Sequence, residues 1–109
     1  MNDIKLKIQQ SAEKNIFYTV HSAFQCIAIN RMISPKEIRN VLSNFQILED
    51  YPYDKRGHTC LIGGKGNNKR IIHLVCFPTD QFLQIITAYL PDEKRWDENL
   101  KQRDDLWNV

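Results

Sequence analysis

The sequence predicts an α+β fold in which N-terminal helices pack on a four-stranded antiparallel sheet, followed by a short C-terminal helix. Three observations lead to this prediction. The first half of the chain carries apolar residues at helical spacings, the second half contains β-branched runs separated by turn residues, and a capping box precedes the last helical segment of the first half. The length of 109 residues suits one core, so we expect residues 1–109 to form a single domain.

Three helices are expected in the first half of the chain. The second of them places Phe24 and Ile27 on one apolar face, which we predict to be buried. Ser34 is the expected N-cap of the third helix in a capping box, with Pro35 at the first helical position and Glu37 at the third. The expected helices span residues 3–14, 21–30 and 35–43.

The hydrophobic period changes at Phe45. Residues 45–49 are predicted to form a strand that ends in a turn at residues 50–54, because that segment holds a proline and two aspartates. Residues 64–68 are rich in glycine and asparagine, a composition suited to positive φ, and therefore predict a hairpin. The other expected strands span residues 59–63, 70–77 and 82–90, and a polar helix carrying Trp96 is expected from residue 92 onward.

Composition and charge restrict the classes of function. The net charge of +2 is too small to indicate nucleic-acid binding by itself. Basic residues nevertheless gather between residues 54 and 70, and this cluster is equally compatible with a solvated loop and with a phosphate-binding patch. No apolar run reaches the length of a membrane helix and no signal peptide is visible, so we expect a cytoplasmic protein without a membrane partner. The clustered basic residues are Lys55, Arg56, Lys65, Lys69 and Arg70.

The cysteines predict reduced thiols. Cys26, Cys60 and Cys76 are odd in number and lie among apolar neighbours, which suits core residues better than a disulfide framework. The pairs formed by His58 with Cys60 and by His73 with Cys76 contain zinc-type donors, but residues three apart on a strand point to opposite faces. We therefore expect no metal and no other cofactor.

No catalytic motif of high specificity is present, so the candidate groups are isolated polar residues. His21, at the start of a helix, is a candidate acid or base, with an exposed or capping histidine as the alternative. His73 interrupts an apolar strand and is either catalytic or a hydrogen-bonded core residue. Thr87 and Tyr89 are two residues apart on the last strand and share a face; Tyr89 is either a proton donor or a core residue with an exposed hydroxyl.

The order of several short motifs resembles the domain-of-unknown-function family DUF4258 over nearly the whole chain. The most distinctive pieces are the pattern EDYP-D at residues 49–54 and the pattern IIT-Y-PD---W at residues 85–96, which are specific together and weak apart. That family resembles the RelE-like toxins, so the resemblance implies a RelE-like fold and an RNA-cleaving toxin. Between His21 and Arg31 the chain is two residues longer than the family pattern, around residues 29–30, and this length difference affects how those two side chains act together.

The resemblance implies the toxin of a type II toxin–antitoxin pair acting as a metal-independent endoribonuclease. Its expected partners are RNA, including ribosome-bound mRNA, and a cognate antitoxin that carries a paired-cysteine zinc motif. In such cleavage the RNA 2′-hydroxyl attacks its neighbouring phosphate while one group removes a proton, another protonates the leaving oxygen and cations stabilise the charge. The alternative is a non-catalytic RNA- or protein-binding module.

Roles in this chemistry are assigned by residue type. His21 and His73 are the candidate base and acid, Tyr89 is an alternative proton donor, and Thr87 is a candidate RNA-binding hydroxyl. The alternative to phosphate binding for Arg31 and Arg70 is an ion pair with a nearby carboxylate. The candidate phosphate-binding cations are Arg31, Lys55, Arg56 and Arg70.

Overall fold

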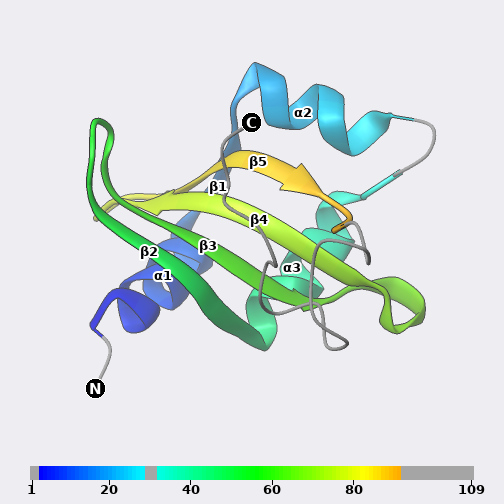
Figure 1. Cartoon of the computed structure of the whole chain (residues 1–109), viewed down its shortest axis with the longest axis horizontal. Coiled ribbons are helices and arrows are strands. Elements are labelled where there is room, and N and C mark those ends of the chain that lie inside the picture. The colour runs from blue at the N-terminus through cyan, green and yellow to red at the C-terminus, as the bar shows by residue number, and fades with distance from the viewer. Residues whose placement is uncertain (1–2, 29–31, 92–109) are drawn as a thin grey trace.

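The structure, a computed structural model, describes residues 3–28 and 32–91 and consists in that part of the chain of three α-helices packed on one five-stranded sheet (Figure 1). The strand order is β1-β5-β4-β3-β2, and all neighbours are antiparallel except β1 and β5. The elements in chain order are α1 (Asp3–Lys14), β1 (Ile16–Tyr18), α2 (Val20–Ile27), α3 (Pro35–Ser43), β2 (Phe45–Asp54), β3 (Gly57–Lys65), the 3-10 turn η1 (Asn67–Lys69), β4 (Ile71–Pro78) and β5 (Leu83–Tyr89).

The predicted four-stranded antiparallel sheet is wrong, because a fifth strand makes the sheet mixed. β1 pairs in parallel with β5, and Ile16 lies opposite Leu83 in the register. A strand of three residues between two helices is too short to show an alternating pattern, which explains why the sequence did not reveal it. A parallel pair needs a long connection, and here the whole segment from α2 to β4 supplies it.

The predicted turn at residues 50–54 is also wrong, because β2 continues through it to Asp54. Pro52 is tolerated in β2 because this strand lies at the edge of the sheet, where a missing N–H donor leaves no neighbour unpaired. A register shift between Tyr51 and Asp54 accommodates the irregular backbone. The predicted hairpin between β3 and β4 is confirmed, and Asn68 within it has a φ of 55°.

The boundaries of α1 and α3 agree with the prediction. The Ser34 hydroxyl accepts a hydrogen bond of 3.1 Å from the Glu37 backbone N–H, as a capping box requires. The Glu37 side chain does not complete the box, since its carboxylate binds Arg70 and the backbone of Asn67. The predicted helix after Asp92, together with Trp96, Arg31 and residues 29–30, lies outside the described residues.

The predicted apolar inner face of α2 is wrong, because Phe24 and Ile27 are 65% and 71% exposed. Polar side chains face the sheet instead. The Ser22 hydroxyl donates to the Ile85 carbonyl at 2.8 Å, and the amide oxygen of Gln25 accepts from the Ala88 N–H at 2.9 Å. The Ile85 carbonyl also accepts from the Thr19 N–H at 3.0 Å, so Ser22 adds a second bond there. β1 ends before Ala88, so the Gln25 side chain satisfies the strand edge at that position.

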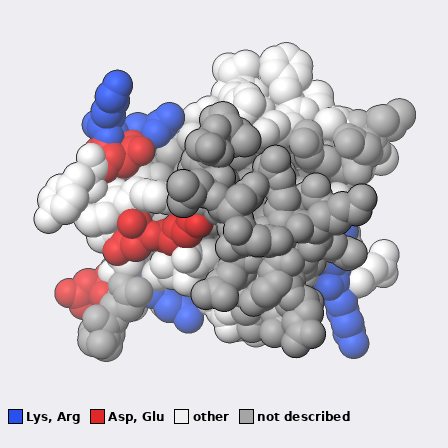
Figure 2. Space-filling view, viewed as in Figure 1, with Lys and Arg blue, Asp and Glu red and all other residues white. Residues whose placement is uncertain are grey.

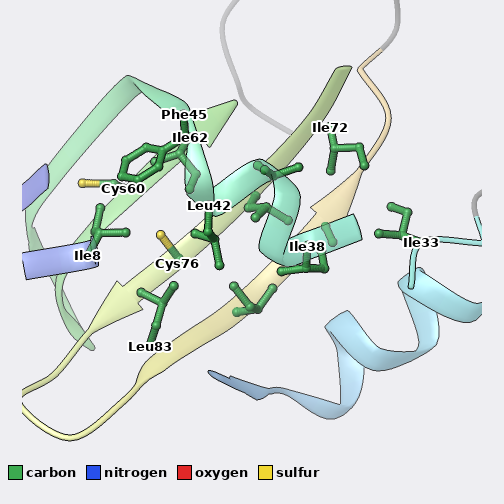
Figure 3. Packing of buried hydrophobic residues seen from close by; sticks show 14 of the residues in the cluster. Ile8, Ile33, Ile38, Leu42, Phe45, Cys60, Ile62, Ile72, Cys76 and Leu83 are labelled. Atoms are coloured by element: carbon green, nitrogen blue, oxygen red, sulfur yellow. The ribbon is translucent and has the colours of Figure 1, made fainter. Parts of the chain in front are cut away.

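The main core lies between the sheet and the helices α1 and α3 (Figures 1 and 3). Its members include Ile8 from α1, Ile38 from α3 and Leu74 from β4, all fully buried. The three cysteines are free and buried, as predicted. Within the described ranges, no helix is long and apolar enough to cross a membrane.

The opposite side of the sheet, here called the distal face, carries a second and smaller apolar cluster. Leu61 from β3, Val75 from β4 and Ile86 from β5 form its buried part. Leu61 and Val75 are paired in the register, which confirms that they share a face. The polar residues of interest are placed by the same alternation along β4 and β5.

Candidate functional site

His73 and Tyr89 meet on the distal face. They lie opposite each other in the β4–β5 register, and the His73 Nδ1 atom is 3.3 Å from the Tyr89 hydroxyl oxygen. Their rings meet edge to face, with centroids 5.4 Å apart. His73 is fully buried, whereas Tyr89 is half-buried. Two of the three predicted acid–base residues are therefore in direct contact, with the phenol as the more accessible group.

Gly63 makes room for the His73 ring. It lies opposite His73 in the β3–β4 register, and a Cβ atom there would lie 3.1 Å from His73 Cδ2 and 2.9 Å from Leu48 Cδ1. Any other residue would push one of these side chains away. Sequence reasoning did not single out Gly63, although a glycine pair at the end of a β-branched run is the signal for such close packing.

Thr87 belongs to the same face. It lies opposite Val75, which is two residues after His73, and it is itself two residues before Tyr89. Thr87, Val75 and the His73–Tyr89 pair therefore lie on one side of the sheet. The irregularity of the β4–β5 register between Val75 and Cys76 interrupts the alternation and leaves the adjacent Ile86 on the same face. The spacing argument from the sequence therefore agrees with the register.

His21 projects from the flank of α2 that is nearer the distal face. Ser22 and Gln25 point to β5, and Cys26 belongs to the main core on the other side of the sheet. Successive residues in a helix are rotated by about 100°, which puts His21 on the flank opposite Cys26. The imidazole is exposed, so it stands at the border of the distal face, beyond the β5 edge.

A pocket of about 560 Å³ lies between the end of α3, on the main-core side of the sheet, and the strands β2 and β3. Its described lining includes Gly63 and Leu48, which border the His73 ring, but neither His73 nor Tyr89. It contains three side-chain amides and one cation, Lys65. Lys65 is the last residue of β3 and lies opposite Ile71, two residues along the strands from the pair formed by Gly63 and His73. The described lining residues are Asn40, Ser43, Asn44, Gln46, Leu48, Gly63, Gly64, Lys65, Gly66 and Ile71.

Arg70 forms an ion pair with Glu37 of α3. Its Nε donates to Glu37 Oε2 at 2.6 Å and its Nη2 donates to Oε1 at 2.5 Å, while the Asn67 N–H donates to Oε2 at 2.7 Å. The hydrogen bond from Arg70 holds the pKa of the buried Glu37 carboxyl below its usual range, and the same bond raises the pKa of Arg70. The guanidinium is therefore engaged by a carboxylate, the arrangement the sequence left open as an alternative to phosphate binding.

Lys55 and Arg56 lie in the hairpin between β2 and β3. Arg56 donates to Asp54 Oδ1 from its backbone N at 2.9 Å and from Nη1 at 3.0 Å, and the backbone bond is the main cause that lowers the pKa of Asp54. From Gly57, next to this hairpin, to Gly63, which lies opposite His73, β3 extends roughly 20 Å. The hairpin is therefore remote from His73. In Figure 2 basic and acidic side chains lie side by side at the hairpin end, and further basic side chains project at the opposite end.

Comparison with known proteins identifies one family. The family model described as "Domain of unknown function (DUF4258)" matches residues 18–90. No curated protein and no solved structure was found to match the chain. The matched segment includes α2, α3 and all four strands from β2 to β5, and therefore every described side chain of the distal face considered above. The chain belongs to the DUF4258 family.

Proposed function

We propose that this domain is an RNA-cleaving toxin, a metal-independent endoribonuclease whose reactive groups lie on the distal face. The contact between His73 and Tyr89 is the observation that carries the proposal, and Gly63 and Leu48, which border the His73 ring, also line the pocket. Cleavage of RNA through its own 2′-hydroxyl needs proton transfer by two positioned groups, and a hydrogen-bonded histidine and tyrosine are groups of that kind.

The burial of the two side chains supports a different role for each of them. The Tyr89 hydroxyl is the accessible member of the pair and would donate or accept the proton at the RNA. His73 lies behind it, fully buried, and acts as a positioning residue that orients the phenol and exchanges a proton with it. His21, on the α2 flank, would supply the second proton-transferring group, and Thr87 a hydrogen bond to the RNA.

The neighbouring pocket suits a nucleotide. Side-chain amides such as those of Asn44 and Gln46 both donate and accept hydrogen bonds, as recognition of a base edge requires. Lys65 is a cation in the same pocket and would hold a phosphate. The volume of about 560 Å³ is in the range of small-molecule sites.

The resemblance of DUF4258 to the RelE-like toxins supports the same function. With it come the other parts of the proposal: RNA that includes ribosome-bound mRNA as substrate, a cytoplasmic site of action, and a cognate antitoxin with a paired-cysteine zinc motif. These features rest on the resemblance alone.

A non-catalytic RNA- or protein-binding module is the second candidate, and one observation favours it. Arg56 and Arg70 are both paired with carboxylates, which leaves fewer cations to stabilise the charge that develops during phosphate chemistry. A binding module does not need that stabilisation. The two candidates differ in whether RNA is cut.

The test is expression of the chain and of its Tyr89→Phe and His21→Ala variants, with growth and RNA integrity as readouts. Tyr89→Phe removes one hydroxyl and keeps the ring, so melting should stay near that of the parent while cleavage falls about 100-fold or more. Tyr53→Phe is the matched control, because Tyr53 is 95% exposed. If both variants cleave RNA like the parent, proton transfer lies elsewhere and the proposal is wrong. RNA binding without cleavage by the parent establishes the binding module instead.

A further inference from the structure

We propose a binding site for a divalent transition metal of the zinc class, formed by Asp50, His58 and Cys60 on the hairpin of β2 and β3. These residues offer a carboxylate oxygen, an imidazole nitrogen and a thiol sulfur, and the three ligand atoms lie within 4.8 Å of one another. The site is separate from the distal face, because Cys60 belongs to the main core on the other side of the sheet. It is therefore independent of the proposed RNA chemistry.

The backbone of the sheet brings the three donors together. His58 and Cys60 are two residues apart on β3, so their side chains point to the same face. Asp50 lies directly opposite Cys60 in the β2–β3 register, and opposed residues carry their Cβ atoms about 4.5–5.5 Å apart. Three donors on two hydrogen-bonded strands are held more rigidly than donors on loops.

Two of the three distances between the donor atoms are close to those of a tetrahedral ion, and the third, from His58 Nε2 to Cys60 Sγ, is within 4.8 Å. Metal–ligand bonds of about 2.0–2.3 Å place neighbouring donors about 3.3–3.8 Å apart in a tetrahedron. The Cys60 Sγ to Asp50 Oδ1 distance is 3.3 Å, which already fits. The His58 Nε2 to Asp50 Oδ1 distance is 2.5 Å, so these two side chains would separate by roughly 1 Å to admit the ion.

The donor set indicates the kind of metal. A thiolate with an imidazole selects borderline or soft ions such as Zn²⁺ and Co²⁺, while Mg²⁺ and Ca²⁺ prefer oxygen ligands only. The side chains of Asp50 and His58 are 48% and 38% exposed, whereas Cys60 is buried. The ion would thus be held by sulfur on the core side and would keep one position open to water.

The expectation of no metal rested on donors taken from one strand at a time. His58 and Cys60 supply only two donors. The third donor, Asp50, lies eight positions before His58 in the chain, on the neighbouring strand β2. The competing explanation is a plain ion pair between Asp50 and His58 with Cys60 as a weak S–H donor. That explanation predicts no affinity for a transition metal.

Titration of the purified chain with Co²⁺, followed by absorbance, distinguishes the two explanations. A thiolate-bound tetrahedral Co²⁺ gives a charge-transfer band in the near ultraviolet and d–d bands in the visible, and Zn²⁺ should displace it at one equivalent per chain. Zn²⁺ should also raise the melting temperature, because it binds only the folded state. No sulfur-to-cobalt band, or no change in melting with Zn²⁺, would overturn the proposal.

Variants locate the ion and guard against a loss of folding. Cys60→Ala should abolish the charge-transfer band, and Asp50→Asn and His58→Gln, both in exposed positions of similar size, should each weaken binding by at least about tenfold. Cys26→Ala removes a buried thiol outside the site and should leave binding unchanged. The inference is wrong if Cys60→Ala binds Co²⁺ like the parent, or if folded Asp50→Asn and His58→Gln both bind with parental affinity.

Discussion

The carboxylate of Glu37 on α3 and the guanidinium of Arg70, just before β4, form a two-pronged ion pair with contacts of 2.6 and 2.5 Å. Glu37 is fully buried, so this pair ties the start of α3 to the loop between β3 and β4. A Cβ atom at Gly66 would come within 2.3 Å of the same carboxylate, which shows how closely the loop wraps around it. The pair is structural, and its loss has a large cost.

Arg70→Ala should lower the free energy of unfolding by about 3 kcal/mol, because it leaves a buried carboxylate without its cation. Urea denaturation at neutral pH measures this change. Lys69→Ala, at an exposed neighbouring position, is the control and should stay within about 0.5 kcal/mol of the parent. Equal stabilities of the two variants would show that Glu37 is satisfied without Arg70.

Acid should weaken the fold through Glu37. The pKa of Glu37 is lowered in the folded state by the hydrogen bond from Arg70. A lowered pKa stabilises the fold fully above the unfolded value of about 4.3, and this stabilisation is lost as the pH falls through the folded pKa below it. As the pH is lowered from 5 to below the pKa of Glu37 in the folded state, the melting temperature of the Glu37→Gln variant should therefore fall less than that of the parent. Parallel pH profiles for the two proteins would contradict this prediction.

Gly63→Ala should reduce RNA cleavage by displacing His73. The added methyl meets His73 at 3.1 Å and Leu48 at 2.9 Å, and overpacking of this kind costs about 1–3 kcal/mol. Adding Leu48→Ala frees space on one side and should restore melting in part. If the double variant regains stability but not cleavage, the His73 orientation matters for the reaction. If the double variant recovers cleavage in full, the Gly63→Ala change acts only through packing and stability, and the orientation of His73 is not what the reaction depends on.

Lys65 should contribute to RNA affinity through the pocket. Lys65→Gln is expected to weaken binding and to reduce the slope of log affinity against log salt by about 0.7–0.9, the value for one phosphate contact. The contrast is the double variant of Lys55 and Arg56 at the far hairpin, for which a smaller effect is expected. A larger effect of the double variant would place the RNA at the hairpin between β2 and β3 instead of the pocket.

Local sequence signals were sufficient for the elements whose causes are local. Ser34 and Pro35 set the start of α3 because a cap and a first-turn proline act within one helical turn. The glycine- and asparagine-rich segment at residues 64–68 located the β3–β4 hairpin for the same reason. The spacing of Thr87 and Tyr89 put both side chains on one face, since alternation follows from strand geometry alone.

Tertiary structure decided everything that depends on which distant segments meet. β1 exists because β5 offers it an edge, and α2 turns Gln25 rather than Phe24 inward because the Ala88 N–H beyond the end of β1 needs an acceptor. The partner of Arg70 lies 33 positions away in the chain, and Asp50 joins His58 only through the β2–β3 register. Residue types and their spacing determined the α3 cap, the β3–β4 hairpin and the shared face of Thr87 and Tyr89, because those interactions act over a few residues. They did not determine the course of β2 at residues 50–54 or the inner face of α2, which depend on the neighbouring strands. Contacts such as that between His73 and Tyr89 arise only when strands pair in one register and not in another, and that choice depends on the packing of the whole domain.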